Sequence, residues 1–203
     1  HAEVLASVQI TSPHGQRAVS LQERQAEMLR EKIKGLEHRI MDMVRNSNDN
    51  TAIATKVHQW TSALLRVKDP FDLPEAVVSG IRTLFDVPQA AVRVWTVAGP
   101  YIDADFTQGA SEDARAFASS LTMPFCGPNL GFEPAGWLAQ EAGEPAQSLA
   151  LLPLREGAID SATPAFGLLV LGSPDPQRFD ATMGTEFLSR IAELASAALV
   201  RLK

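Results

Sequence analysis

A single cysteine is the only thiol that this chain of 203 residues offers for chemistry. Cys126 lies in the stretch "PFCGPNLG" (residues 124–131), where two prolines and two glycines favour a turn. A reactive cysteine needs a lowered pKa, but no Lys, Arg or His stands near Cys126 in the sequence. No second cysteine could resolve a mixed disulfide. We therefore expect Cys126 to be a small buried or pocket-lining residue rather than a nucleophile.

The other residues that do chemistry are poorly placed for catalysis. All four histidines, His1, His14, His38 and His58, lie in the amino-terminal third, so a catalytic triad or a Cys126–His58 pair would have to bridge to the rest of the chain. No His/Cys cluster has metal-ligand spacing, and no glycine-rich phosphate loop is found. We predict a protein without catalytic residues and without a metal site, whose cofactor, if it binds one, the sequence does not identify.

The charge of −6 is unevenly distributed along the chain. Residues 1–68 carry ten Lys/Arg and seven Asp/Glu, a net charge of +3, whereas residues 69–203 carry eight against seventeen, a net charge of −9. A domain this acidic repels the phosphate backbone of nucleic acid. No run reaches the roughly 20 apolar residues of a membrane helix. The sequence therefore argues against nucleic-acid and membrane partners, and the single cysteine favours the cytoplasm.

A heptad repeat dominates residues 20–47. Ser20 and Glu23 have the spacing of a capping box at the start of a helix. The apolar residues then alternate in steps of three and four: Ala26, Ile33 and Ile40 at position a, and Leu29, Leu36 and Met43 at position d. Ile at a with Leu at d favours a parallel two-stranded coiled coil. The alternative is one amphipathic helix that packs on its own domain.

The remaining sequence predicts an α+β domain. After a polar interruption at residues 46–51, which breaks or loosens the helix, a second helical pattern spans residues 53–67, and another helix follows Asp72. The strands expected are 90–97 with a hairpin partner at 101–106, a short edge strand or loop at 122–131, and the apolar runs 147–155 and 165–173, which a loop joins. Helices are expected at 111–121, capped by Ser111, at 133–140 and at 179–203. The last helix places one apolar stripe at Phe187, Ile191, Leu194, Ala198 and Leu202. We expect an antiparallel sheet flanked by helices, with residues 1–48 as an arm and 49–203 as the domain.

Several blocks of the sequence resemble known proteins. Residues 165–199, "AFGLLVLGSPDPQRFDATMGTEFLSRIAELASAAL", resemble the closing strand and helix of GAF domains. More narrowly, the chain resembles the bacterial family DUF484, through "AVSLQERQAEMLREKIKGLEHRI", "PFCGP", "SLALLPL" and "LGSPDPQRFDATMGTEFLSRI". The resemblance implies a helical dimerisation arm followed by a GAF-like domain. GAF domains commonly bind small molecules between sheet and helices and relay binding through coiled coils, while others serve only as dimer scaffolds.

Two ligand classes of GAF domains find no support in the sequence. The chain has no "NKFDE"-type motif, which the cyclic-nucleotide-binding subgroup carries. Cys126 is followed by Gly127 and not by the histidine that accompanies a covalently bound tetrapyrrole.

The resemblance also places a candidate ligand site over the sheet. Arg93 alternates with Val92 and Val94, so it shares a sheet face with Trp95. The candidate ligand-binding residues are Arg93, Trp95, Phe106, Phe125, Cys126, Asn129 and Trp137. The same aromatic residues could equally fill the core.

These observations predict a non-enzymatic, homodimeric GAF-like sensor or regulatory module that acts on another, unidentified protein. Two alternatives stay open: a thiol-dependent redox enzyme that uses Cys126, and a protein–protein adaptor without a ligand.

Overall fold

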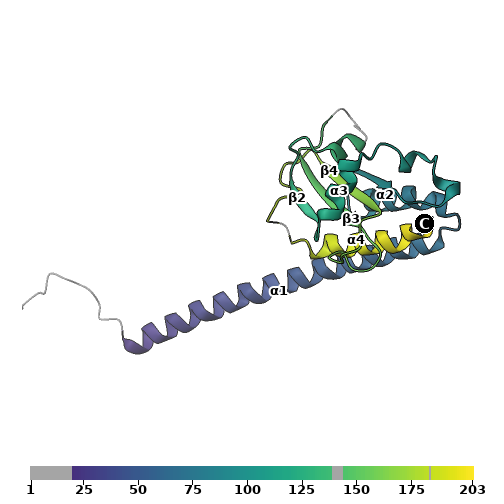
Figure 1. Cartoon of the computed structure of the whole chain (residues 1–203). Helices are drawn as coiled ribbons and strands as arrows, with labels where there is room; N and C mark the ends of the chain where they lie inside the picture. The colour runs from purple at the N-terminus through teal and green to yellow at the C-terminus, as the bar shows by residue number, and fades with distance from the viewer. Residues whose placement is uncertain (1–19, 139–143, 183) are drawn as a thin grey trace, which may run out of the picture. The chain divides into compact units, whose positions relative to one another are not determined.

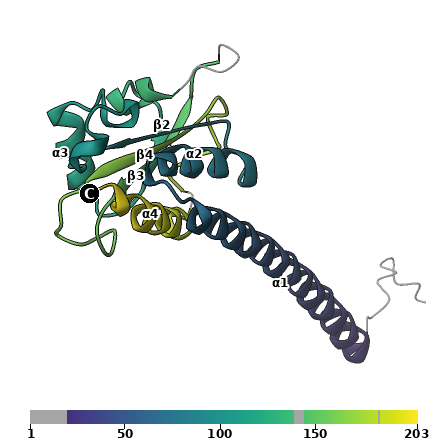
Figure 2. The ribbon, with the colours of Figure 1, turned by 90° about the vertical axis from the view of Figure 1, so that its right-hand side faces the viewer.

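The computed structural model describes residues 20–138, 144–182 and 184–203 (Figures 1 and 2). The chain divides between residues 51 and 52 into two units, which we describe separately. From Leu21 onward, the described part of the first unit is helical. The second unit is a sheet with helices on both faces, so the predicted α+β class and the long amino-terminal helix are confirmed.

The amino-terminal helix α1 runs without interruption from Leu21 to Arg66. The predicted capping box begins it: the Ser20 N–H donates to Glu23 Oε2 (3.2 Å), and the Gln22 N–H donates to Ser20 Oγ (3.2 Å). Residues 46–51 were expected to break or loosen the helix; a break is wrong, because these polar residues continue it. Asn, Ser and Asp lower helix propensity by only about 0.5 kcal/mol each, which a long helix tolerates.

Within the residues that the structure describes, four antiparallel strands form the sheet, in the order β1-β4-β3-β2. The strands are β1 (Gln89–Val94), β2 (Phe125–Pro128), β3 (Ser148–Leu154) and β4 (Gly167–Ser173). The two apolar runs are strands, as predicted, and they pair as a central hairpin. β2 is a short edge strand, which is one of the two alternatives expected for residues 122–131.

The hairpin predicted after β1 is wrong. β1 pairs with β4, with Ala90 opposite Leu171 and Val92 opposite Leu169. Residues 99–101 and 105–107 form two short 3-10 helices instead, η2 and η3. Pro100 cannot donate to a strand ladder, and Thr107 Oγ1 donates to the carbonyl oxygens of Ile102 (2.9 Å) and Ala104 (2.7 Å), which favours the turns.

One face of the sheet shares an apolar cluster with three helices. These are the carboxyl-terminal part of α1, α2 (Leu73–Leu84) and α4 (Glu186–Leu199), which is followed by the short 3-10 helix η6 (Val200–Leu202). Their buried side chains include Trp60, Leu64, Val77, Ile81, Leu188, Ile191, Ala195 and Leu199. The predicted stripe of the last helix is therefore slightly rotated: Ile191 and Leu202 are buried, whereas Phe187, Leu194 and Ala198 are partly buried.

The opposite face carries a second apolar cluster. Helix α3 (Glu112–Ser120) and the 3-10 helix η4 (Glu133–Trp137) lie on it. Ser111 caps α3 as predicted, because its Oγ accepts from the Ala114 N–H (3.1 Å). The cluster's buried members are Ala91, Trp95, Ala118, Leu138, Ala146, Leu149, Leu151, Ala165, Leu168 and Val170. The predicted site residues are divided between these two faces.

A glycine allows α2 to approach α1 closely. A Cβ added to Gly80 would lie 2.6 Å from Trp60 Nε1 and would overlap the indole ring, which is fully buried. We expect Gly80→Ala to lower the free energy of unfolding by about 1–3 kcal/mol in urea titrations, because neither backbone nor ring can move freely. Gly35→Ala is the matched control: it is also a glycine within a helix, with nothing within 4 Å, so only the stabilising gain in helix propensity should be seen. Equal effects of the two substitutions would contradict the close contact.

Candidate functional site

The structure brings together four of the seven candidate residues. Arg93, Trp95, Phe125 and Trp137 all lie on the face of the sheet that α3 and η4 cover. Cys126 belongs to the cluster on the opposite face, because adjacent strand residues point to opposite sides, and Phe106 of η3 packs against that same cluster. Asn129 follows the end of β2, and its side chain holds a loop. We therefore take the first four as the candidate site.

Arg93 is the charged residue of this group. Its guanidinium lies 5.9 Å from the centre of the Trp137 ring, and its Nη1 donates to the Val92 carbonyl oxygen (3.0 Å). Its Nε is buried and finds no hydrogen-bond acceptor among the described residues. Burial lowers the pKa of Arg93, and the negative charge of Asp105 partly offsets this. A half-buried cation with an unused donor suits recognition of a group that accepts hydrogen bonds.

The two tryptophans of the site are fixed by backbone carbonyls. Trp95 Nε1 donates to the Ala165 carbonyl oxygen (2.7 Å), and the guanidinium of Arg115 lies 5.8 Å from the centre of its ring. Trp137 Nε1 donates to the Gly109 carbonyl oxygen (3.0 Å). Both rings therefore have a defined position, and each has a guanidinium over one side. This arrangement of aromatic and guanidinium groups suits the binding of a ligand, and it contains no nucleophile or general base.

Phenylalanines fill the neighbouring part of the face. The ring centres of Phe125 and Phe132 lie 5.3 Å apart in an edge-on arrangement. The ring of Phe132 stacks on that of Phe117, with their centres 6.0 Å apart. Asn129 supports the loop beside them: its Nδ2 donates to the Ala146 carbonyl oxygen (2.9 Å), and its Oδ1 accepts from the Gly131 N–H (3.1 Å). With its amide used in this way, Asn129 positions the loop, and the sequence-based expectation that it contacts a ligand stays a prediction.

Cys126 has the environment of an inert thiol. It is only 8% exposed, and burial, with a smaller contribution from the charge of Asp180, raises the pKa of its thiol to about 11. At pH 8 we expect iodoacetamide to modify it at least about 100-fold more slowly than a free cysteine, because the thiolate fraction falls by that factor. Protein unfolded in urea is the control and should react at the ordinary rate. Fast modification of the folded protein would restore the redox alternative.

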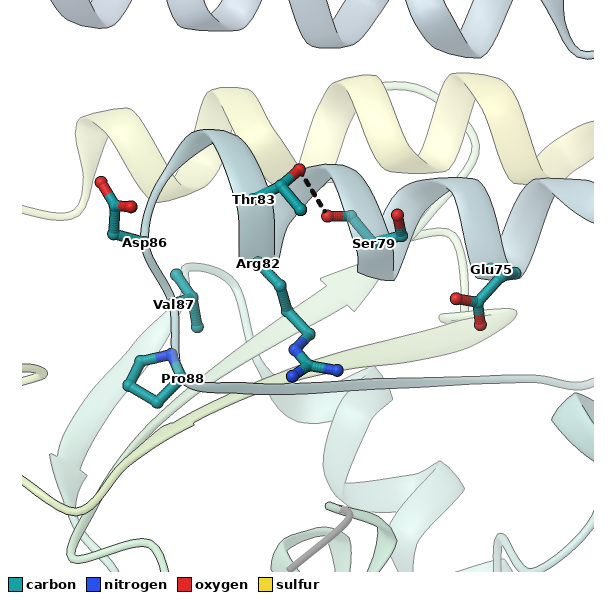
Figure 3. A pocket seen from close by; sticks show the side chains of 7 residues that line it. All are labelled: Glu75, Ser79, Arg82, Thr83, Asp86, Val87 and Pro88. Atoms are coloured by element: carbon teal, nitrogen blue, oxygen red, sulfur yellow. Dashed lines mark hydrogen bonds between the residues drawn. The ribbon is translucent and has the colours of Figure 1, made fainter. Parts of the chain in front are cut away.

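A polar groove that the sequence did not reveal lies along α2 and the turn into β1 (Figure 3). Its volume is about 500 Å³, and its lining residues are Glu75, Ser79, Arg82, Thr83, Asp86, Val87 and Pro88. Asp86 has a left-handed backbone (φ 54°), and its Oδ2 lies 3.4 Å from Lys56 Nζ. The spacing of Glu75, Ser79 and Arg82 marks one polar helix face, which is the ordinary signature of a solvated surface. With opposite charges and no cysteine or histidine in its lining, this groove is a weaker candidate than the sheet face.

Sequence reasoning also missed Arg155. It is 3% exposed and follows the all-buried strand β3. Its Nη2 donates to the carbonyl oxygens of Ser119 (2.6 Å) and Leu121 (2.7 Å) and, at 3.4 Å, to that of Ala118; its Nη1 donates to those of Ser161 (3.1 Å) and Thr163. The only signal in the sequence was a charge directly after the run "SLALLPL". Arg155 ties the end of α3 to the loop between β3 and β4 and thereby supports the covered face.

The described residues contain neither a metal-binding cluster nor a membrane-spanning helix. Within the described ranges, no group of three or more His, Cys, Asp or Glu side chains could hold a metal ion. None of the helices described here is long and apolar enough to cross a membrane.

Comparison with known proteins identifies the family. No curated protein matches the chain. Among solved structures, it is similar to the GAF domain of a protein described as a sensor histidine kinase from Pseudomonas syringae pv. tomato, with 16% identity, a TM-score of 0.48, and coverage of 77% of this chain and 91% of that one. It is also similar to the A. aeolicus nlh2 GAF domain in an inactive state, with 11% identity, a TM-score of 0.49, and coverage of 76% and 99%. The profile of DUF484, a protein family of unknown function, matches residues 1–203, so the chain belongs to this family, as its sequence blocks indicated.

Proposed function

We propose that this protein is a non-enzymatic, homodimeric GAF-like regulatory module that passes a signal to another chain. The observation that carries the proposal is an uncovered apolar stripe on α1. The seam residues Leu29, Ile33, Leu36 and Ile40 are 60%, 54%, 47% and 59% exposed in the single chain. A row of large apolar side chains in water marks an interaction surface, and a heptad spacing indicates another helix as its partner.

The domain of residues 52–203 would supply the regulatory input through a small molecule bound at Arg93 and Trp137. Buried cations without full compensation are costly and are concentrated at functional sites. The guanidinium charge of Arg93 favours a ligand with a carboxylate or phosphate group, and the adjacent indole favours a flat apolar portion. Cytoplasmic location and the absence of nucleic-acid and membrane partners stay predictions from composition.

Native mass spectrometry of freshly purified protein tests both parts of the proposal. We expect twice the chain mass plus a small excess that is lost on denaturation. The excess should also be lost in Arg93→Met and retained in the control Arg190→Met, whose side chain is exposed on α4. A bare dimer would favour the adaptor alternative. An excess that survives denaturation and maps to Cys126 would favour the thiol alternative, which the raised pKa of that thiol does not support. A bare monomer would contradict the proposal as a whole.

A further inference from the structure

We propose that the arm binds a second copy of this chain in a parallel, in-register coiled coil, and that ion pairs between Lys32 of one copy and Glu37 of the other select this alignment. The inference rests on the proposed homodimer and adds its orientation, its register and the residues that specify them. It is carried by the charges that flank the exposed stripe of α1.

The apolar seam has defined ends within the described helix. Its first layer is Ala26 and its last is Met43, a rise of about 26 Å along the helix. The next two seam positions are Ser47 and Asn50, which are polar and exposed. A seam of three heptads is short, so its flanking charges weigh heavily in the choice between alignments.

In a parallel dimer, each position g faces the following position e of the partner. Lys32 at g then faces Glu37 at e, and the pair occurs twice by symmetry. The other flanking pairs, Gln25 with Arg30 and Arg39 with Val44, contain no like charges. The parallel alignment therefore has two attractive pairs and no repulsive pair. Isoleucine at a with leucine at d, as in Ile33 and Leu36, favours the same geometry.

An antiparallel dimer gives a different charge pattern. The alignment that matches all six layers places Ala26 opposite Met43, and Ile33 opposite Leu36. Positions g then face each other, which brings Lys32 against Arg39 twice. Positions e also face each other, which places Arg30 opposite Glu37 twice. The two attractive pairs at e therefore cancel the two repulsive pairs at g. The charges on α1 thus distinguish the two orientations without reference to the apolar residues.

The sign of one charge reversal separates the orientations. In the parallel dimer, Lys32→Glu places two glutamates opposite each other and should raise the dissociation constant about 3- to 10-fold at low salt. The double variant Lys32→Glu/Glu37→Lys should restore it to within about twofold. In the antiparallel dimer, Lys32→Glu would instead meet Arg39 and tighten binding. Sedimentation equilibrium measures all three constants, and tightening or no change on Lys32→Glu would overturn the inference.

Disulfide trapping gives an independent readout of orientation. Ala26→Cys alone should form an inter-chain disulfide under mild oxidation, because position a meets its own copy in a parallel dimer. In the antiparallel alignment the two copies of residue 26 lie about 26 Å apart, and only a mixture of Ala26→Cys and Met43→Cys would cross-link. Glu31→Cys, on the outer face at position f, is the control and should not cross-link. If the disulfide forms only in the mixture of the two variants, the parallel alignment is refuted and the homodimer is not. If the wild-type chain is a monomer, the proposed homodimer itself is refuted.

Discussion

Ile33→Asp combined with Ile40→Asp is expected to convert the proposed homodimer into a monomer, with a dissociation constant raised at least about 1000-fold. Both side chains are more than half exposed in the single chain, so the substitutions remove nothing from the core of residues 52–203. In the dimer, however, they would bury four carboxylates at the seam without partners. Sedimentation velocity should report the monomer, while the thermal unfolding midpoint of the domain changes by no more than about 2 °C.

The matched control places the same charge on the outer face of the same helix. Lys34→Asp lies at position b, next to Ile33 in sequence but away from the seam. It lowers helix propensity by a similar amount and should leave the dimer intact. If the seam variant stays dimeric, or if both variants become monomeric, the coiled-coil interface is refuted.

The largest effect on stability is expected at Arg155. Arg155→Met would leave the carbonyl oxygens at the end of α3 and in the loop after β3 without their shared donor. We expect the free energy of unfolding to fall by about 3–5 kcal/mol, as for other buried charged hydrogen-bond networks that lose one partner. Urea unfolding followed by tryptophan fluorescence measures the loss, because Trp95 lies on the face that this network supports.

A surface arginine shows what charge alone contributes. Arg190 Nη2 lies 2.8 Å from Glu186 Oε1, and both side chains are exposed. Arg190→Met should change the free energy of unfolding by less than about 0.5 kcal/mol. If Arg155→Met were equally mild, the carbonyl network would be structurally unimportant.

The sequence predicted the elements whose patterns are local and strong. A few neighbouring residues were enough to predict the capping box at Ser20, the cap at Ser111 and the apolar runs of β3 and β4. The hairpin expected at residues 101–106 failed because strand pairing depends on a partner far away in sequence. β1 pairs with β4, more than 70 residues later in the sequence, and both faces of β4 are fully buried.

The candidate site was partly predictable for the same reason. Strand alternation correctly placed Arg93 and Trp95 on one face, and applied to Phe125 and Cys126 it would have separated those two neighbours. The contact between Arg93 and Trp137 joins residues 44 positions apart, and Arg155 donates to carbonyl oxygens of two segments, residues 118–121 and 161–163. Every residue has a backbone carbonyl that can accept a hydrogen bond, so no pattern of side chains in the sequence predicts which carbonyls Arg155 contacts.

The shortness of β2 has a consequence for self-association in concentrated solution. This edge strand spans four residues and ends at Pro128, so at most three of its residues carry an N–H group. Since only alternate residues of an edge strand direct their amides outward, a strand of a second molecule would find too few donors here to extend the sheet. Proline at an exposed edge is one of the devices by which proteins resist growth into fibrils. We expect this margin of the sheet to stay closed to amyloid-like stacking even when the protein is crowded.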